Sequence, residues 1–219
     1  MKNFNTFLKA VLAVACSAAS LQALDSRRPL AEISHDQWGP EQGFSWGAVH
    51  AIAQTEDGYL WIGAEQGLVR FDGARFRLLD SNKAPALPTG RVLGLLADRE
   101  NNLWVRFATE GLFRYRNGRI DDMLAGQEDR LIEMMYRRAD GTPMFQSTWT
   151  AVFTYDAGTD KVNRLGVRIR PVVTAPAETP DGTLWLGTRD DGLVYLRSPR
   201  EGIQKTGFRS GRINWVWLL

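Results

Sequence analysis

The chain has a single cysteine among its 219 residues, Cys16, and only two histidines, His35 and His50. Cys16 lies in an N-terminal segment that we expect to be removed, so the mature chain is predicted to contain neither a disulfide nor a cysteine-ligated metal site. The two histidines fall on different expected strands and do not form a metal-binding pair. No nucleophile elbow, P-loop or dinucleotide fingerprint occurs either. We therefore predict no metal and no cofactor.

Neither sign of charge dominates, and long apolar runs are scarce. The chain has 27 Lys and Arg against 25 Asp and Glu, which gives a net charge of +2, and the two signs are interspersed. This distribution argues against a nucleic-acid-binding groove. After the N-terminal segment, no stretch approaches 18 consecutive apolar residues, so no membrane span is expected in this chain.

Residues 1–23 differ in composition from the rest of the chain. Two lysines precede an apolar run of small residues, Ala10 to Ala19, which contains no acidic side chain, and the segment ends at Ala23. This pattern predicts a secretory signal peptide at 1–23 and a mature chain of 24–219. Cys16 lacks the leucine that usually stands three residues before a lipidated cysteine, so a lipoprotein anchor is not expected.

A unit consisting of a turn and a tryptophan recurs four times, at intervals of 43, 40 and 41 residues. A strand-like segment follows each anchor after six or seven residues, and a third apolar segment precedes each anchor by about twelve. The anchor positions are Trp61, Trp104, Met144 and Trp185. The residues that begin the following segment are Gly67, Gly111, Ala151 and Gly192.

Each unit is predicted to form four short strands, because its segments are rich in branched and aromatic residues and are separated by Gly- and Asn-containing turns. Four strands every 40 to 45 residues is the period of a propeller blade. We therefore predict an all-β fold, an incomplete β-propeller of four-stranded antiparallel blades. The expected blades are 44–81, 87–125, 127–165 and 167–206, with the start of a fifth at 208–219.

The recurring residues are expected to be structural. Packing requires the same residue in every blade, so the three tryptophan anchors are expected to wedge between adjacent sheets. The three glycines are expected to permit a positive φ or a close backbone approach. Met144 and Ala151 depart from the pattern, so the packing of the third blade is expected to differ.

Two further sets of recurring residues have a structural explanation. Asp57, Asp140 and Asp181 occupy equivalent turns and are expected to form turns rather than a catalytic carboxylate pair. The dipeptides Asp57-Gly58 and Asp181-Gly182 predict two-residue hairpin turns in which both residues have positive φ. Arg70 and Arg114 are expected to form cross-strand salt bridges or to extend along the sheet face.

Propeller ligands usually bind at one end of the central channel, where loops from several blades converge. Candidate ligand-binding residues are therefore the non-recurring polar or aromatic ones near the inner strands: Trp46, His50, Gln54 and Arg91. Two alternatives stay open: His50 as an ordinary inner-strand residue, and Trp46 as an aromatic that packs on its own blade. A second candidate, for an anionic ligand, is the cluster of Arg164, Arg168 and Arg170.

The Asp-Gly-x-Leu-Trp-Ile-Gly segment at 57–63 and the Gly-Leu-x-Arg-Phe-Asp-Gly segment at 67–73 resemble regulator propeller repeats. The similarity to this two-component regulator propeller family is greatest over 38–76. The family forms the periplasmic sensor region of bacterial hybrid histidine kinases and of some diguanylate cyclases. The resemblance implies a non-catalytic, periplasmic, ligand-sensing module of a transmembrane signalling receptor, here truncated before the membrane span and the output domain.

The expected ligand is a small molecule or an oligosaccharide whose identity stays open. Trp215 and Trp217 lie in the apolar segment at the C-terminal end, and an open strand edge there predicts self-association. Two other functions are also compatible with the sequence. One is an exported propeller enzyme that acts on glycans, and the other is a protein-interaction scaffold that uses this edge.

Overall fold

The computed structural model describes residues 36–79, 87–148, 151–168, 173–189, 192–197 and 203–207. The predicted signal peptide (1–23), His35, Arg170 and the predicted start of a fifth blade (208–219), with Trp215 and Trp217, lie outside the described residues. The chain divides into two units, Met1–Trp38 and Gly39–Leu219. All strands of the described residues belong to the second unit.

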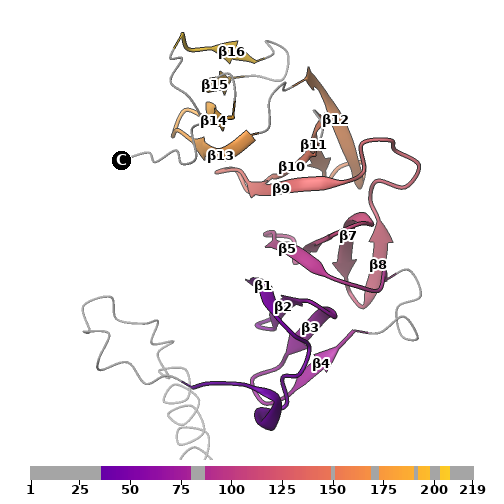
Figure 1. The fold of residues 1–219 in the computed structure, drawn as a ribbon. Coiled ribbons are helices and arrows are strands. Elements are labelled where there is room, and N and C mark those ends of the chain that lie inside the picture. Colours follow the sequence, from indigo (N-terminus) through magenta and orange to yellow (C-terminus); the bar gives the residue numbers. More distant parts are fainter. Residues whose placement is uncertain are drawn as a thin grey trace, which may run out of the picture. The chain divides into compact units, whose positions relative to one another are not determined.

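In the described residues, the strands form four antiparallel sheets of four strands each, which we call blades 1 to 4 (Figure 1). Blade 1 follows a short 3-10 helix, η2 (Pro40–Gln42), and contains β1 (Val49–Gln54), β2 (Leu60–Ala64), β3 (Gly67–Phe71) and β4 (Phe76–Leu78). Blade 2 contains β5 (Val92–Ala97), β6 (Leu103–Phe107), β7 (Gly111–Arg116) and β8 (Arg119–Asp122). Blade 3 contains β9 (Ile132–Arg137), β10 (Pro143–Ser147), β11 (Ala151–Asp156) and β12 (Lys161–Arg168). Blade 4 contains β13 (Val173–Glu178), β14 (Leu184–Thr188), β15 (Leu193–Leu196) and β16 (Gln204–Lys205).

Within each blade, every strand pairs with the next strand in the sequence. The first strands of successive blades lie on the same side, and β5 contacts both β1 and β9 (Figure 1). This is the arrangement of propeller blades, so the predicted β-propeller fold is confirmed. One boundary differs: β12 continues to Arg168, past the expected end of the third blade at 165.

The turn between the first two strands of a blade contains one residue with positive φ, and this residue is Gly58, Asn101, Gly141 or Gly182. In blade 1, Thr55 N–H donates to Tyr59 O and Gly58 N–H donates to Thr55 O, so the loop holds three residues. The expectation of a two-residue turn with positive φ at the aspartate as well is therefore wrong.

The aspartates of these turns accept hydrogen bonds from the backbone. In blades 3 and 4, the N–H groups of Thr142 and Thr183 donate to the carboxylates of Asp140 (2.8 Å) and Asp181 (3.0 Å). These bonds hold the turn in shape. The predicted turn-forming role of these two aspartates is confirmed.

Adjacent blades pack face to face, and a tryptophan lies at the centre of the first two of these contacts. Trp61 is 1% exposed and its ring centroid lies 4.6 Å from that of Tyr115 in blade 2. Trp104 is fully buried and lies 4.8 Å from the ring of Phe145 in blade 3. Trp185 is half-buried and contacts Tyr195 of its own blade. The indoles of blades 1 and 2 thus fill the space between two sheets.

The indole N–H groups of these three tryptophans each have an acceptor six residues earlier in the chain. Trp61 Nε1 donates to Thr55 Oγ1 at 2.9 Å, and Trp185 Nε1 donates to Thr179 Oγ1 at 3.3 Å. Trp104 Nε1 donates to the buried Asp98 carboxylate at 2.8 Å. A buried indole N–H without an acceptor would lower the stability of the fold. The tryptophan of a blade therefore depends on the acceptor residue in the turn before it.

Blade 3 has neither the tryptophan nor the acceptor residue that the other three blades have. Met144 replaces the tryptophan and has no N–H to donate, and Arg138 replaces the acceptor. Arg138 donates instead to Glu178 of blade 4, through Nη2 at 2.9 Å and Nε at 3.2 Å. Met144 packs with Leu184 and Leu186 of blade 4 beside a small apolar cavity of about 20 Å³. The contact between blades 3 and 4 is therefore built differently from the first two.

Replacing Trp104 with Phe removes the bond to the buried Asp98 carboxylate and leaves a gap between blades 2 and 3. We expect a loss of about 2–4 kcal/mol in the free energy of unfolding, measured by urea denaturation. Trp185→Phe is the matched control, because its indole is less deeply buried than that of Trp104 and its hydrogen bond is longer. Equal losses in the two variants would contradict this account.

Two of the recurring glycines, Gly67 and Gly192, have φ values of 138° and 72°. Gly111 combines a φ of 102° with a close approach to the next blade, since a Cβ built there would lie 2.7 Å from the Arg130 carbonyl oxygen. The residue is therefore restricted both by its backbone conformation and by its neighbour.

Gly111→Ala should cost more stability than Gly118→Ala. Gly118 also has positive φ (82°), but a Cβ there would meet nothing within 4 Å. The control variant measures the backbone strain alone, about 1–2 kcal/mol, and the excess in Gly111→Ala measures the clash between blades. Thermal unfolding of both variants makes the comparison, and an excess near zero would show that the blades do not approach each other as described.

Candidate functional site

Two of the four predicted ligand-binding residues meet at one end of blades 1 and 2. His50 lies on β1, and Arg91 lies directly before β5 of the next blade. Glu65, in the turn between β2 and β3, joins them: His50 Nε2 lies 2.9 Å from Glu65 Oε2, and Arg91 Nε and Nη2 donate to Glu65 Oε1 at 2.9 and 2.7 Å. We call His50, Glu65 and Arg91 the rim cluster.

Backbone hydrogen bonds fix the position of the rim cluster. Glu65 N–H donates to Ala48 O at 2.9 Å, which ties the β2–β3 turn to the start of β1. Ala108 N–H donates to Arg91 O at 3.0 Å and holds Arg91 against the corresponding turn of blade 2. The cluster therefore links the inner strand of one blade to the entrance of the next.

In the rim cluster, Glu65 pairs with Arg91, and both side chains remain accessible to solvent. The hydrogen bond from His50, followed by that from Arg91, holds the pKa of Glu65 below its usual value. The side chain of Glu65 is 40% exposed and that of Arg91 is 49% exposed. A solute can therefore reach the guanidinium group while Glu65 keeps it in place.

The other two predicted residues do not join this cluster. Gln54 lies at the opposite end of β1, where its Nε2 donates to Gly58 O at 3.2 Å. The ring of Trp46 packs against Phe44 and Phe76 of blade 1, with ring centroids 5.5 and 6.4 Å away. Trp46 is thus an aromatic that packs on its own blade, one of the alternatives that the sequence left open.

Glu65 was missed by the sequence analysis. It stands two residues before Gly67, in a turn whose sequence changes from blade to blade. The available signal was its non-recurring charge in a turn that faces the same end of the blade as His50.

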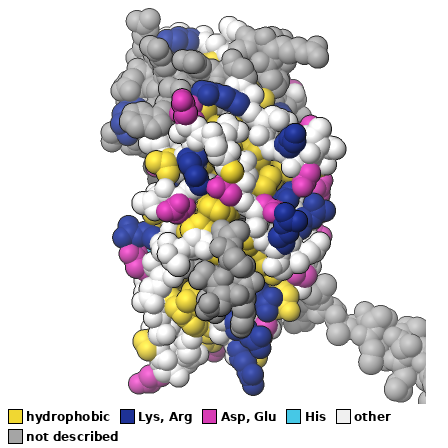
Figure 2. Space-filling model, turned by 90° about the vertical axis from the view of Figure 1, so that its right-hand side faces the viewer, with side chains coloured by type: hydrophobic (Ala, Val, Ile, Leu, Met, Phe, Trp, Pro, Cys, Tyr) yellow, Lys and Arg dark blue, Asp and Glu magenta, His cyan; other side chains and the backbone are white. Residues whose placement is uncertain are grey.

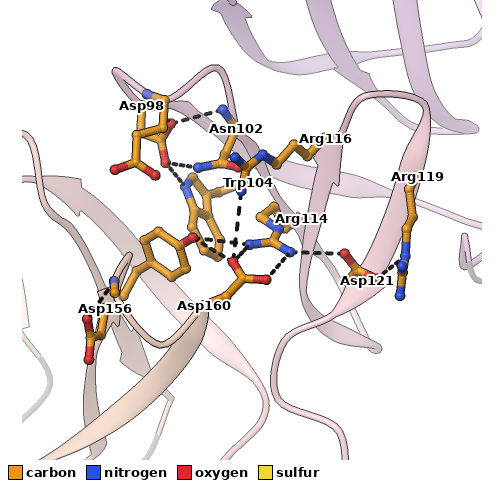
Figure 3. A network of polar contacts seen from close by, with 12 residues as sticks. Asp98, Asn102, Trp104, Arg114, Arg116, Arg119, Asp121, Asp156 and Asp160 are labelled. Carbon is orange, nitrogen blue, oxygen red and sulfur yellow. Dashed lines mark hydrogen bonds and ion pairs between the residues drawn. The ribbon is translucent and has the colours of Figure 1, made fainter.

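A buried arginine forms a second polar network, between blades 2 and 3 (Figure 3). Arg114 on β7 has a side chain only 6% exposed. Its guanidinium group donates to Asp121 on β8 at 3.0 Å, to Tyr155 Oη at 3.2 Å and to both carboxylate oxygens of Asp160 in the β11–β12 turn. Tyr155 Oη also donates to Asp160, at 2.7 Å.

The predicted cross-strand salt bridge of Arg114 is confirmed by Asp121, its partner in the β7–β8 register. The contact with Asp160 in the next blade was not predicted. At the equivalent place in blade 1, Arg70 faces Arg77 across the strands. Its guanidinium group lies 4.3 Å from the ring centroid of Tyr59 and packs along the sheet face, which was the other expectation.

The network shifts the pKa values of its members. Hydrogen bonds from Arg114 and then Tyr155 lower the pKa of Asp160 to about 2. Burial, followed by the bond to Asp160, raises the pKa of Tyr155 to about 12. Asp160 is therefore an anion and Tyr155 a neutral donor at physiological pH, and the ion pair across the two blades persists in mild acid.

A groove of about 650 Å³ runs along this network, between the outer edges of blades 2 and 3. Its lining carries both signs of charge, and the side of the blades seen in Figure 2 shows basic and acidic side chains close together. The acidic lining residues Asp121, Asp122 and Asp160 each pair with an arginine. The groove is therefore largely neutralised by its own ion pairs.

The predicted arginine cluster is described only in part. Arg164 pairs with Asp129 at 2.9 Å, which gives its charge a partner within the protein. Arg168 ends β12, and nothing is described of its side chain. The suggestion that this cluster contacts an anionic ligand stays a prediction.

Across the described parts of the chain, no helix combines the length and the hydrophobicity that a membrane span needs. The same parts contain no group of three or more His, Cys, Asp or Glu side chains placed to hold a metal ion.

A family model described as the two component regulator propeller matches residues 43–66. The match covers β1, β2 and the turn that carries Glu65, within the segment where the resemblance was expected to be greatest. The expected resemblance is confirmed there. Comparison with curated protein sequences finds no significant match.

Solved structures share the fold. The extracellular domain of BT3049 from B. thetaiotaomicron, assigned to a hybrid two component system, has a TM-score of 0.64 and 20% identity over 79% of this chain and 26% of that chain. The extracellular domain of BT4673 from the same organism, assigned to a one component system, has a TM-score of 0.60 and 19% identity over 77% and 25%. Virginiamycin B lyase from Staphylococcus aureus has a TM-score of 0.55 and 13% identity over 74% and 56%.

These comparisons define the class of domain. The chain spans about a quarter of the length of the two B. thetaiotaomicron structures. Identities of 20% or less show the fold alone. The chain thus contains a propeller domain like the extracellular domains of two-component systems, and its propeller fold also occurs in an enzyme.

Protonation of Asp160 should make the stability depend on pH. Because its pKa is lowered from 3.8 to about 2 in the folded chain, the stabilisation is complete above about pH 4 and is lost as the pH falls through 2. Asp160→Asn should be less stable at pH 6 and should lose part of the decline between pH 4 and 2. Urea midpoints across this range measure the effect.

Glu56→Gln, which removes the charge of an exposed carboxylate in blade 1, outside this network, is the control for the change in net charge. An Asp160→Asn profile parallel to that of the wild type would mean that the ion pair across blades 2 and 3 does not form.

Proposed function

We propose that this chain is a non-catalytic, extracytoplasmic sensor module that binds a small molecule or an oligosaccharide at the rim cluster. The observation that carries the proposal is the rim cluster itself, in which His50 of blade 1 and Arg91 of blade 2 meet at Glu65. The end of a propeller where several blades converge is the usual place for a ligand.

The chemistry of the rim cluster suits a ligand with hydroxyl or carboxylate oxygens. Arg91 uses Nε and Nη2 for Glu65, and among the described residues no hydrogen bond occupies Nη1. This nitrogen can donate to a ligand while the bond to Glu65 keeps the guanidinium group oriented.

The location of the rim cluster suits a sensor. Its three residues come from two blades, so a ligand that contacts Arg91 and His50 together favours one separation of blade 1 and blade 2. A ligand that binds one arrangement better than another shifts the population towards it. In a receptor, such a shift is the signal that a further domain would read.

The extracytoplasmic location is supported by two observations. Residues 1–23 have the pattern of a secretory signal peptide. The two B. thetaiotaomicron structures with the same fold are extracellular domains. We propose the periplasm as the compartment.

A binding experiment tests the proposal. The purified chain is titrated calorimetrically with a panel of neutral and uronic-acid-containing oligosaccharides, and the products are analysed after prolonged incubation. We expect binding without turnover, and a loss of at least tenfold in affinity in Arg91→Ala, about 1.4 kcal/mol. Arg119→Ala is the matched control, because that side chain is 80% exposed on β8 and belongs to the other network.

Two results would contradict the proposal. Binding that survives Arg91→Ala unchanged would place the ligand elsewhere. Turnover of an oligosaccharide would favour the glycan-active enzyme that the sequence left open.

A further inference from the structure

Two cations of the groove between blades 2 and 3 are not used by the ion pairs that neutralise the rest of it. The charged side chains of its lining are Arg114, Arg116, Arg119, Lys161, Asp121, Asp122 and Asp160. Asp121 pairs with both Arg114 and Arg119, and Asp122 pairs with Arg130. Of the carboxylates in the described lining, these pairs leave only Asp160 for Arg116 and Lys161.

Asp160 is itself occupied by Arg114. Both of its carboxylate oxygens accept hydrogen bonds from the Arg114 guanidinium group, and Tyr155 Oη donates another at 2.7 Å. Arg116 Nη1 lies 4.0 Å from Asp160 Oδ1, which is too far for a hydrogen bond (Figure 3). Among the described residues, the side chains of Arg116 and Lys161 therefore donate no hydrogen bond to a carboxylate.

The β7–β8 turn places Arg116 beside another cation. The turn consists of Asn117 and Gly118, whose φ values are 50° and 82°, and it sets Arg116 directly opposite Arg119. Like charges in such a pair repel each other. Arg119 donates to Asp121 at 2.7 Å and is 80% exposed, whereas the side chain of Arg116 is 42% exposed. An anion bound beside Arg116 would therefore reduce the repulsion between the two arginines.

The uncharged part of the lining suits a molecule with several hydroxyl groups. The side-chain amides of Asn117 and Gln127 make no hydrogen bond within the described residues, so they are available as donors and acceptors. Met123 and Val162 add apolar surface beside them. The volume of about 650 Å³ is within the usual range of small-molecule sites.

We propose that this groove binds a phosphate ester of a sugar or of a similar polyhydroxylated molecule, at a site separate from the rim cluster. A phosphate monoester carries about 1.5 to 2 negative charges at pH 7 and three strong acceptor oxygens. Arg116 and Lys161 supply two cations to this group, and hydrogen bonds between such charged partners are the strong ones. The amides of Asn117 and Gln127 bind the hydroxyl groups.

Calorimetric titration of the full chain with glucose 6-phosphate tests the proposal, and glucose 6-sulfate, glucose and inorganic phosphate are titrated for comparison. We expect glucose 6-phosphate to bind most tightly. The sulfate ester has a similar shape with less negative charge, glucose has no anionic group, and inorganic phosphate has no sugar hydroxyls.

Variants locate the binding. Arg116→Gln and Lys161→Gln should each weaken the binding of the sugar phosphate about tenfold or more, because each removes a charged hydrogen-bond donor. Arg77→Gln is the matched control: it removes the same charge from an exposed side chain on β4, outside the groove. Arg91→Ala should also leave this binding unchanged, so the proposal for the rim cluster and this one fail separately.

A second measurement uses the unaltered chain and so does not depend on how a variant folds. Phenylglyoxal modifies accessible arginines, and peptide mass spectrometry follows the rate at each of them. Glucose 6-phosphate should slow the modification of Arg116 and leave the rates at Arg77 and Arg91 unchanged.

Four outcomes would overturn the proposal. One is the absence of glucose 6-phosphate binding. Another is inorganic phosphate that binds as tightly as the ester, which would mean an adventitious ion only. The third is an equal loss of affinity in Arg116→Gln and Arg77→Gln, which would mean general attraction to a basic surface. The fourth is modification of Arg116 that the sugar phosphate does not slow.

Discussion

The structure depends on covering both faces of each sheet. A four-stranded blade has two apolar faces, and neither is stable in water unless another sheet covers it. In this chain an indole does so for blades 1 and 2: Trp61 and Trp104 are almost completely removed from solvent between adjacent sheets. Their N–H groups donate to residues in the turn of the same blade, Thr55 and Asp98, so neither indole N–H is left unpaired.

At the contact between blades 3 and 4, the tryptophan, its hydrogen-bond acceptor and the residue that faces it are all replaced. Where Met144 replaces the indole, the acceptor has become Arg138, which pairs with Glu178 of the following blade. The facing aromatic has changed too: Tyr115 and Tyr155 face the two buried indoles, whereas blade 4 has Leu196 at that place. The contact between blades 3 and 4 thus combines aliphatic packing with a nearly buried ion pair, since the Glu178 side chain is 3% exposed. The replacement of the indole by Met144 is thus accompanied by a change in its acceptor and in the residue that faces it.

The fold could be predicted from the sequence because its signals lie within a blade. The spacing of Trp61, Trp104 and Trp185 reports the repeat directly, and the glycines before the third strands mark backbone that needs positive φ. The number of residues in the first turn could not be predicted, because Asp-Gly is compatible with loops of either length.

The candidate site was harder to predict because its contacts cross blades. Glu65 and Arg91 are 26 residues apart, and Arg114 and Asp160 are 46 apart, so no short motif joins either pair. Gln54 was grouped with His50 because both lie on one inner strand, yet four residues of strand separate them by roughly 13 Å. Which end of a strand a residue occupies matters as much as which strand it is on.

The central claim, that aromatic contacts across blades hold the sheets together, is tested most directly by a double-mutant cycle between Trp61 of blade 1 and Tyr115 of blade 2. The free energies of unfolding of Trp61→Leu, Tyr115→Leu and the double variant give the coupling. With ring centroids 4.6 Å apart, the account predicts a coupling of about 0.5–1.5 kcal/mol. Purely additive losses would show that the two rings do not meet, and would contradict the packing of blades described for this chain.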